Sequence, residues 1–317
     1  MKRKICLSLL GLGIALVLRA QDAETALAKV HYIFKHVNDT TVRDKFLQDE
    51  VITYIGKSGS YYTSYSSNRM QEEVKRQMDA PDFDGKLVFK TKTTAIAESY
   101  LFNSAKRTLR EISKVGRDFY YVENTYPDLN WTILDDTKTI GGYSCQKAQT
   151  TYKGRTYEAW FTTELPFSYG PWKLQGLPGL ILSATDLTHD VTFEYAGFDK
   201  VDSENQFVAT PAGASKTTGA EILKLKEAFK ANPTAFLQTR SSGSGAQIMT
   251  ANADGGAISV GGGNAPGGTV TVRGSFSAGG SGSAASMDMS KIKSFNIGQD
   301  DNYKPSRNTN NPIELTP

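Results

Sequence analysis

The sequence predicts a mainly β protein, with antiparallel strands forming a curved sheet or half-barrel covered by one or two α-helices. Three observations support this. Short segments rich in aromatic and β-branched residues recur over roughly the first 180 residues after the N-terminal leader, few helical patterns separate them, and turn residues stand between them. Closely spaced strands without intervening helices favour antiparallel pairing over parallel strand-helix-strand units.

The strand pattern starts close to the N-terminal end. Val30, Tyr32 and Phe34 alternate with polar neighbours, and residues 51–55 and 61–65 flank a glycine-containing turn. Six further segments share the aromatic and β-branched composition: 118–126, 130–134, 143–152, 155–163, 180–185 and 191–198. Lys153-Gly154 supplies turn chemistry between two of these segments, as expected for a hairpin.

A first helix is predicted directly after the segment 61–65. Asn68 and Gln71 have the spacing of a capping box, Val74 and Met78 lie one turn apart on one face, and Pro81 ends the pattern. Such a face usually packs on the core of a globular domain, although it can also bind a partner. We expect a surface helix that covers a sheet.

A second helix is predicted near residue 220. Thr218 and Glu221 form another possible capping box, Ile222 and Phe229 belong to one apolar stripe, and Asn232-Pro233 provides the stop. This stripe is also expected to face the core.

The N-terminal 20 residues have the pattern of a secretory signal peptide. Lys2, Arg3 and Lys4 precede an apolar stretch over residues 5–18, and the small residue Ala20 suits processing before Gln21. The apolar stretch is short for a membrane span, so cleavage is favoured over a retained anchor. We therefore expect a periplasmic or secreted protein without a stable transmembrane anchor after cleavage.

Removal of this leader changes the composition. The leader carries four basic and no acidic residues, so its loss takes the formal net charge from +3 to −1. A nearly neutral chain gives no electrostatic indication of nucleic-acid binding. Of the two cysteines, Cys6 is lost with the leader and Cys145 remains. One thiol cannot form an internal disulfide, so the fold has to depend on its hydrophobic core.

Composition divides the rest of the chain into three parts: a β-rich domain over 21–240, a Gly/Ser/Ala-rich insertion over 241–287 and a C-terminal tail over 288–317. The insertion has few large apolar groups to offset the entropy of ordering, so a flexible segment is expected. Its glycines do not complete a phosphate-binding motif.

A Gly- and Pro-rich string precedes the segment 180–185. It reads Gly-Pro-Trp-Lys-Leu-Gln-Gly-Leu-Pro-Gly-Leu-Ile over residues 170–181, and we call it the hallmark loop. Its defining positions are Gly170, Pro171, Gly176, Leu177, Pro178, Gly179, Leu180 and Ile181. Proline fixes the backbone and glycine permits unusual dihedral angles, so a shaped loop should enter the strand.

The hallmark loop resembles the motif of the GLPGLI family of exported Bacteroidota proteins. Other parts of the chain that are similar to this family are residues 136–148, Arg155, Ala159-Trp160, Pro166 and the C-terminal Asn-Pro-Ile-Glu motif at 311–314. The resemblance implies a cell-envelope or secreted location. The family has no established biochemical activity, so the resemblance implies no reaction.

Four aromatic residues beside or within the hallmark loop are candidates for ligand binding: Trp160, Phe167, Tyr169 and Trp172. They could line a groove for a peptide, a glycan or an acyl chain. The alternative is that they seal the end of the β core, because buried aromatic area stabilises a fold without any ligand.

A second cluster follows the segment 180–185, the strand that the hallmark loop enters. Two carboxylates around an imidazole, at Asp186, His189 and Asp190, could form an acid/base pair or bind a metal. The alternative is a polar turn between two strands. His31 and His36, five apart on one strand, should point to opposite faces, and Cys145 is expected to be a buried, inert thiol. No metal or cofactor signature is recognised.

Two hypotheses about function remain open. The first is a noncatalytic binding or accessory protein of the cell envelope, whose partner is an envelope protein, a peptide or an apolar ligand held on a concave sheet. The second is a hydrolase that uses Asp186, His189 and Asp190. Convergence of these three side chains in a pocket would favour the hydrolase.

Overall fold

The structure is a computed structural model, and it describes residues 23–91, 96–201, 206–241, 292–299 and 303–316. The predicted leader (residues 1–20) and nearly all of the Gly/Ser/Ala-rich segment (residues 241–287) lie outside these ranges.

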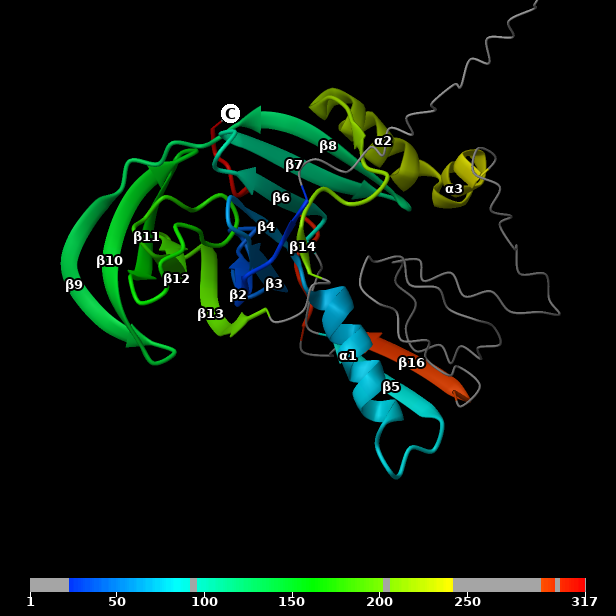
Figure 1. The fold of residues 1–317 in the computed structure, drawn as a ribbon. Helices are drawn as coiled ribbons and strands as arrows, with labels where there is room; N and C mark the ends of the chain where they lie inside the picture. The colour runs from blue at the N-terminus through cyan, green and yellow to red at the C-terminus, as the bar shows by residue number, and fades with distance from the viewer. Residues whose placement is uncertain (1–22, 92–95, 202–205, 242–291, 300–302, 317) are drawn as a thin grey trace, which may run out of the picture.

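The largest sheet in the described part of the chain has twelve strands (Figure 1), in the order β15-β8-β7-β6-β4-β3-β2-β13-β12-β11-β10-β9. Its strands are β2 (Ala28–His36), β3 (Leu47–Ile55), β4 (Gly59–Ser64), β6 (Glu98–Asn103), β7 (Thr108–Val115), β8 (Asp118–Thr125), β9 (Thr132–Ile140), β10 (Tyr143–Tyr152), β11 (Arg155–Thr162), β12 (Leu180–Asp186), β13 (Val191–Lys200) and β15 (Ser215–Lys216). All neighbours in this sheet pair antiparallel except β15 and β8. The predicted fold class is therefore confirmed.

The sheet curls on itself (Figure 1). The connection from β8 to β9 leads from one end of the sheet order to the other. The hallmark loop and the residues just before it lie inside the curl. Leu165, Tyr169, Trp172, Leu174 and Leu177 from this segment are buried and belong to the main hydrophobic core. The concave face is thus filled by the protein's own chain.

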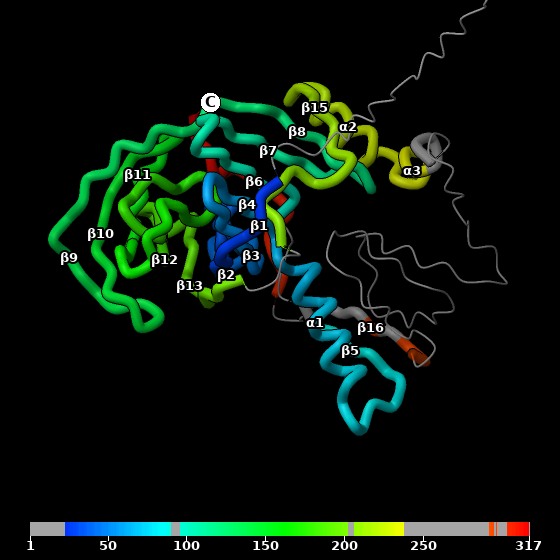
Figure 2. The backbone as a smooth tube through the Cα atoms, viewed as in Figure 1, coloured from blue at the N-terminus to red at the C-terminus, as the bar shows by residue number. Residues whose placement is uncertain are grey.

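The opposite face of the sheet carries a second core. Ile52 and Tyr54 of β3 point to this face because side chains alternate along a strand. They pack in one cluster with Leu101, Ile112 and Val208. Val208 belongs to β14 (Phe207–Val208), which pairs with β1 (Glu24–Thr25), and Figure 2 shows these two segments running together beside the sheet.

Helix α1 (Ser66–Met78) lies beside a separate parallel pair of strands, β5 (Lys86–Thr91) and β16 (Ser294–Gln299). Val74 and Met78 pack with Leu87 and Phe89 of β5, so this part of α1 covers β5. The predicted capping box is wrong: α1 begins before Asn68, its cap residue is Tyr65, and no side chain caps it. A cap must precede the first helical turn, and Asn68 lies within that turn.

The second predicted helix is confirmed as α2 (Gly219–Ala231), and α3 (Pro233–Ser241) follows it. The Thr218 side chain accepts a hydrogen bond from the Glu221 amide at 3.3 Å, as expected for a cap. Ile222 packs with Val115 and Tyr120, so α2 covers the β7–β8 end of the sheet. Across the described ranges, no helix combines the length and apolar character needed to cross a membrane.

Candidate functional site

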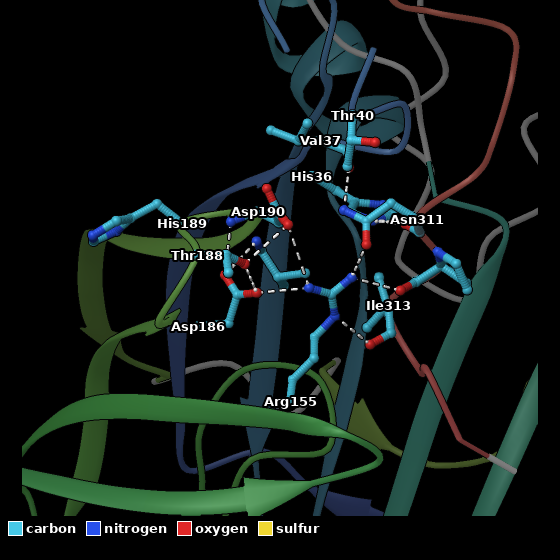
Figure 3. A network of polar contacts seen from close by, with 12 residues as sticks. His36, Val37, Thr40, Arg155, Asp186, Thr188, His189, Asp190, Asn311 and Ile313 are labelled. Carbon is cyan, nitrogen blue, oxygen red and sulfur yellow. Dashed lines mark hydrogen bonds and ion pairs between the residues drawn. The ribbon is translucent and has the colours of Figure 1, made fainter. Parts of the chain in front are cut away.

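The two carboxylates of the Asp186–Asp190 turn, proposed above as part of an acid/base cluster, belong to a buried polar network (Figure 3). Asp186 ends β12, and its Oδ1 accepts hydrogen bonds from the amides of Asp190 (2.7 Å) and Val191 (2.9 Å). Its Oδ2 accepts from Arg155 Nη1 at 2.6 Å and from the Thr188 hydroxyl at 2.8 Å. Asp186 is therefore saturated with donors that the protein itself supplies.

Arg155, at the start of β11, is the centre of this network. Only 4% of its surface is exposed. Besides Asp186, its guanidinium donates to the carbonyl oxygens of Ile313 (2.9 Å) and Pro312 (2.7 Å) and to Asn311 Oδ1 (2.5 Å). A planar guanidinium with several fixed donors suits this arrangement better than a lysine would. The network fastens the C-terminal segment to the sheet.

His189 does not join this network. It is exposed, its backbone φ is 54°, and its Nδ1 lies 3.3 Å from the Thr185 hydroxyl. Figure 3 shows its ring pointing away from the two carboxylates. The imidazole that does join is that of His36, whose Nε2 lies 2.8 Å from the Asn311 carbonyl oxygen. The three residues of the hydrolase hypothesis are close in sequence, but their side chains do not converge.

His36 and His31 lie on opposite faces of β2, as expected. Burial lowers the pKa of His36; the hydrogen bond with Asn311 opposes this effect and the charge of Arg155 adds to it. His31 instead lies 3.2 Å from Glu50, at the other face of the sheet. Within the described residues, no three His, Cys, Asp or Glu side chains are grouped so that they could hold a metal ion.

The four candidate aromatic residues divide into two pairs. Tyr169 and Trp172 are buried in the main core, where the Trp172 ring lies edge-on to Tyr152 with centroids 5.7 Å apart. Trp160 and Phe167 are only partly buried. The Lys138 ammonium lies 4.1 Å from the Trp160 ring centroid, in a cation–π contact. The four residues do not line one groove.

The hallmark loop packs closely against the end of the neighbouring strand β11. A Cβ on Gly179 would lie 2.0 Å from the carbonyl oxygen of Thr162, so only glycine fits there. Trp172 has a φ of 54°, which is unusual for a bulky residue. Its neighbour Lys173 is buried between the carboxylates of Glu111 (3.2 Å) and Glu314 (2.6 Å). Burial opposes the charge of Lys173, but these two carboxylates raise its pKa above the ordinary value.

An open pocket lies elsewhere, on the face opposite the main core. Its volume is about 560 Å³, and none of the residues singled out from the sequence as candidate site residues lines it. The walls come from β2, β3, the first turns of α1 and the segment after β13. The lining residues are Lys29, Tyr54, Tyr65, Asn68, Gln71, Glu72, Lys200, Val201 and Gln206.

Charged groups fix one wall of this pocket. The Tyr65 hydroxyl donates a hydrogen bond to Glu72, and the Arg69 guanidinium lies 5.3 Å from the Tyr65 ring centroid. Arg69 also bridges Glu72 (2.8 Å) and Glu50 (2.9 Å from Nε). Burial favours the neutral form of Glu50, but hydrogen bonds from His31 and Arg69 outweigh it and lower its pKa to about 2.

The pocket has a polar rim and an aromatic floor. Asn68, Gln71 and Glu72 stand at i, i+3 and i+4 on α1, so their side chains lie on one face of the helix. Tyr54 and Tyr65 are almost fully buried beneath this rim. Sequence reasoning missed the pocket because it considered only the apolar stripe of α1. The polar i, i+3, i+4 set was the available signal.

Comparisons with known proteins give one match by sequence family. A family model described as the N-terminal domain of N-glycanase peptide matches residues 86–219. No curated protein matches this chain. Two solved crystal forms of PNGF-II, in space groups P21 and C2, are each 14% identical to it, with TM-scores of 0.43 and 0.44. Each covers 63% of this chain, and the chain spans about a third of their length (33% and 32%).

Proposed function

We propose that this protein is an exported, noncatalytic binding protein of the cell envelope, and that its ligand is a glycan or a glycosylated peptide. The observation that carries the proposal is the pocket between α1 and the sheet. Its volume of about 560 Å³ lies within the range of small-molecule sites. The match of residues 86–219 to an N-glycanase N-terminal domain also supports a glycan-related role.

A polar ligand fits the protein better than an apolar chain does. An acyl chain would need the concave face of the sheet, and Leu165, Tyr169, Trp172, Leu174 and Leu177 already fill that space. The lining of the open pocket instead offers amide, carboxylate, ammonium and phenol groups. Burying such groups is costly unless the ligand supplies hydrogen-bond partners. A saccharide supplies them through its hydroxyl groups.

The pocket is also prepared for binding before the ligand arrives. Tyr65 is held by Glu72 and Arg69, and Arg69 is held in turn by Glu50. Side chains that are already fixed lose little conformational entropy on binding. Asn68 and Gln71 remain exposed on the rim and can hydrogen-bond to a ligand.

Export and membership of the GLPGLI family are part of this proposal. They are supported by the basic and apolar leader over residues 1–20 and by the hallmark loop over 170–181. N-terminal sequencing of the protein recovered from the periplasm or the medium tests export. We expect the mature chain to begin at Gln21. Recovery of an uncleaved chain in the cytoplasm would contradict it.

Binding is tested with a glycan array followed by calorimetry on the glycans retained. Asn68→Trp fills the pocket rim, and we expect it to weaken binding roughly tenfold or more. Lys75→Trp is the matched control, because it places the same side chain two turns further along α1 and Lys75 does not line the pocket. The proposal fails if no glycan binds the folded protein, or if both variants bind as the wild type does.

A further inference from the structure

We infer that the C-terminal residues 303–316, called the strap here, hold the hallmark loop in a strained conformation, so that release of the strap opens the interior of the curled sheet. This inference does not depend on the glycan pocket, which lies on the other face. It rests on three sets of contacts: those that hold the strap, those that join the strap to the hallmark loop, and those that keep the loop strained.

Side-chain contacts and a few isolated backbone hydrogen bonds hold the strap, and it forms no strand ladder. The backbone bonds include those from the Ser306 amide to the Lys45 carbonyl oxygen (2.9 Å) and from the Leu315 amide to the Lys153 carbonyl oxygen (2.9 Å). Asn38, just after β2, donates to the carbonyl oxygens of Ser306 (3.1 Å) and Asn308 (2.6 Å). The Tyr303 hydroxyl accepts from the Gln48 amide at 2.9 Å. Such contacts can be released one at a time, without breaking the pairing of the large sheet.

Towards its C-terminal end, the strap is hydrogen-bonded to the sheet at the Asn-Pro-Ile-Glu motif. Arg155 donates to three consecutive strap residues, Asn311, Pro312 and Ile313, at 2.5 to 2.9 Å. The Asn311 side chain also donates to the Val37 carbonyl oxygen at 2.7 Å. The motif is therefore where the strap is bound most firmly.

One ion pair joins the strap to the hallmark loop. Glu314 Oε1 lies 2.6 Å from Lys173 Nζ, and the Lys173 side chain is only 8% exposed. The other carboxylate at this ammonium group, Glu111 of β7, is further away at 3.2 Å. Loss of Glu314 leaves a buried ammonium with a single counter-charge, which is unfavourable because a buried charge needs full pairing. Movement of Lys173 towards solvent relieves this.

The residue before Lys173 is strained. Trp172 adopts a left-handed backbone with φ of 54°, which a bulky side chain avoids unless its surroundings impose it. Its ring is held between Tyr152 (5.7 Å) and Tyr157 (6.0 Å). Once Lys173 is free, the backbone at Trp172 can relax, and this moves the ring out of the core.

The consequence is a switch between a filled and an open interior. Leu174 and Leu177 follow Trp172 and are buried in the same core, so they move with the loop. An open interior exposes apolar surface on the concave side of the sheet. The bound strap therefore keeps the interior of the curled sheet closed. Its release gives the domain an accessible apolar groove on the concave side of the sheet.

Hydrogen–deuterium exchange on the full chain tests this. We compare wild type with Asn311→Ala combined with Glu314→Gln, and use Thr309→Ala as the control, because Thr309 is an exposed strap residue. We expect exchange in residues 166–179 to accelerate roughly tenfold or more, together with the strap, while β2 and β3 stay protected. Glu314→Gln alone, which keeps the shape of the side chain, should give a smaller change in the same residues.

Two outcomes overturn the inference. If the strap exchanges faster while residues 166–179 do not, the strap does not hold the loop. If the loop, β2 and β3 all accelerate equally, the strap contributes only to global stability. Should the double variant fail to fold, the single variant Glu314→Gln decides between the same outcomes.

Discussion

Replacing Arg155 with methionine tests whether the Arg155 network stabilises the protein. Methionine replaces the aliphatic stem of arginine with an unbranched apolar side chain and removes the charge and all donors. In the wild type, Arg155 donates one hydrogen bond to Asp186 and three to the C-terminal residues 311–313. The variant therefore leaves a buried carboxylate without its cation and three oxygens without a donor.

The expected loss follows from this burial. Removing one partner of a buried ion pair costs about 3–5 kcal/mol, because the other charge stays buried without compensation. Asp186 keeps its bonds from the amides of Asp190 and Val191, which reduces the loss. We expect about 4 kcal/mol in the free energy of unfolding. In a chain of this size that lowers the melting temperature by about 8–16 °C.

Urea unfolding followed by circular dichroism measures this difference directly. Arg117→Met is the matched control, since Arg117 is exposed on the β7–β8 turn and should change stability by less than about 0.5 kcal/mol. Arg155→Lys keeps the charge but loses the fork geometry, so it should fall between the two. A loss below about 1 kcal/mol in Arg155→Met would refute the reasoning, because surface ion pairs contribute that little.

Two further predictions concern other parts of the fold. Gly141→Ala should cost about 1–3 kcal/mol more than Gly142→Ala: both have a positive φ, but only at Gly141 would the added Cβ meet a Tyr195 ring carbon, at 2.2 Å. Thermal melting of the two variants gives the comparison, and equal melting temperatures would show that this ring is free to move. The pKa of Glu50, lowered to about 2 although burial opposes it, adds stability that is present above pH 4.5 and lost as the pH falls towards 2. Between pH 4.5 and 2, Glu50→Gln should reduce the pH-dependent change in the free energy of unfolding by on the order of 2 kcal/mol, after allowance for solvent screening. An unchanged acid-unfolding profile would contradict this.

Most strands could be predicted from the sequence, and some could not. Alternation identified β2 and the β3–β4 hairpin, and turn chemistry at Lys153-Gly154 identified the β10–β11 hairpin. The strands β6 and β7 were missed, because their charged and small residues hide the period. Helix α1 was predicted, but its partner was not: β5 pairs with β16, about two hundred residues further along the chain. Local patterns carry no information about such distant pairing.

The candidate site shows the same division. The sequence drew attention to the hallmark loop, Arg155 and the Asn-Pro-Ile-Glu motif as separate features, and the structure joins them through Arg155 and through the Lys173–Glu314 pair. It also separates His189 from the carboxylates beside it, because the turn exposes the imidazole and buries the acids. Proximity in sequence therefore suggested a catalytic cluster that the side-chain directions do not form.

The sequence by itself determined the fold class, because strand periodicity and turn residues are local properties of the chain. Only the tertiary structure decided which aromatic residues are core and where an open pocket lies. All four candidate residues are aromatic, so their residue types do not distinguish them. The curl of the sheet nevertheless buries Tyr169 and Trp172 and leaves Trp160 and Phe167 partly exposed. Burial and cavities depend on how distant strands and loops pack together, and no local pattern specifies that packing.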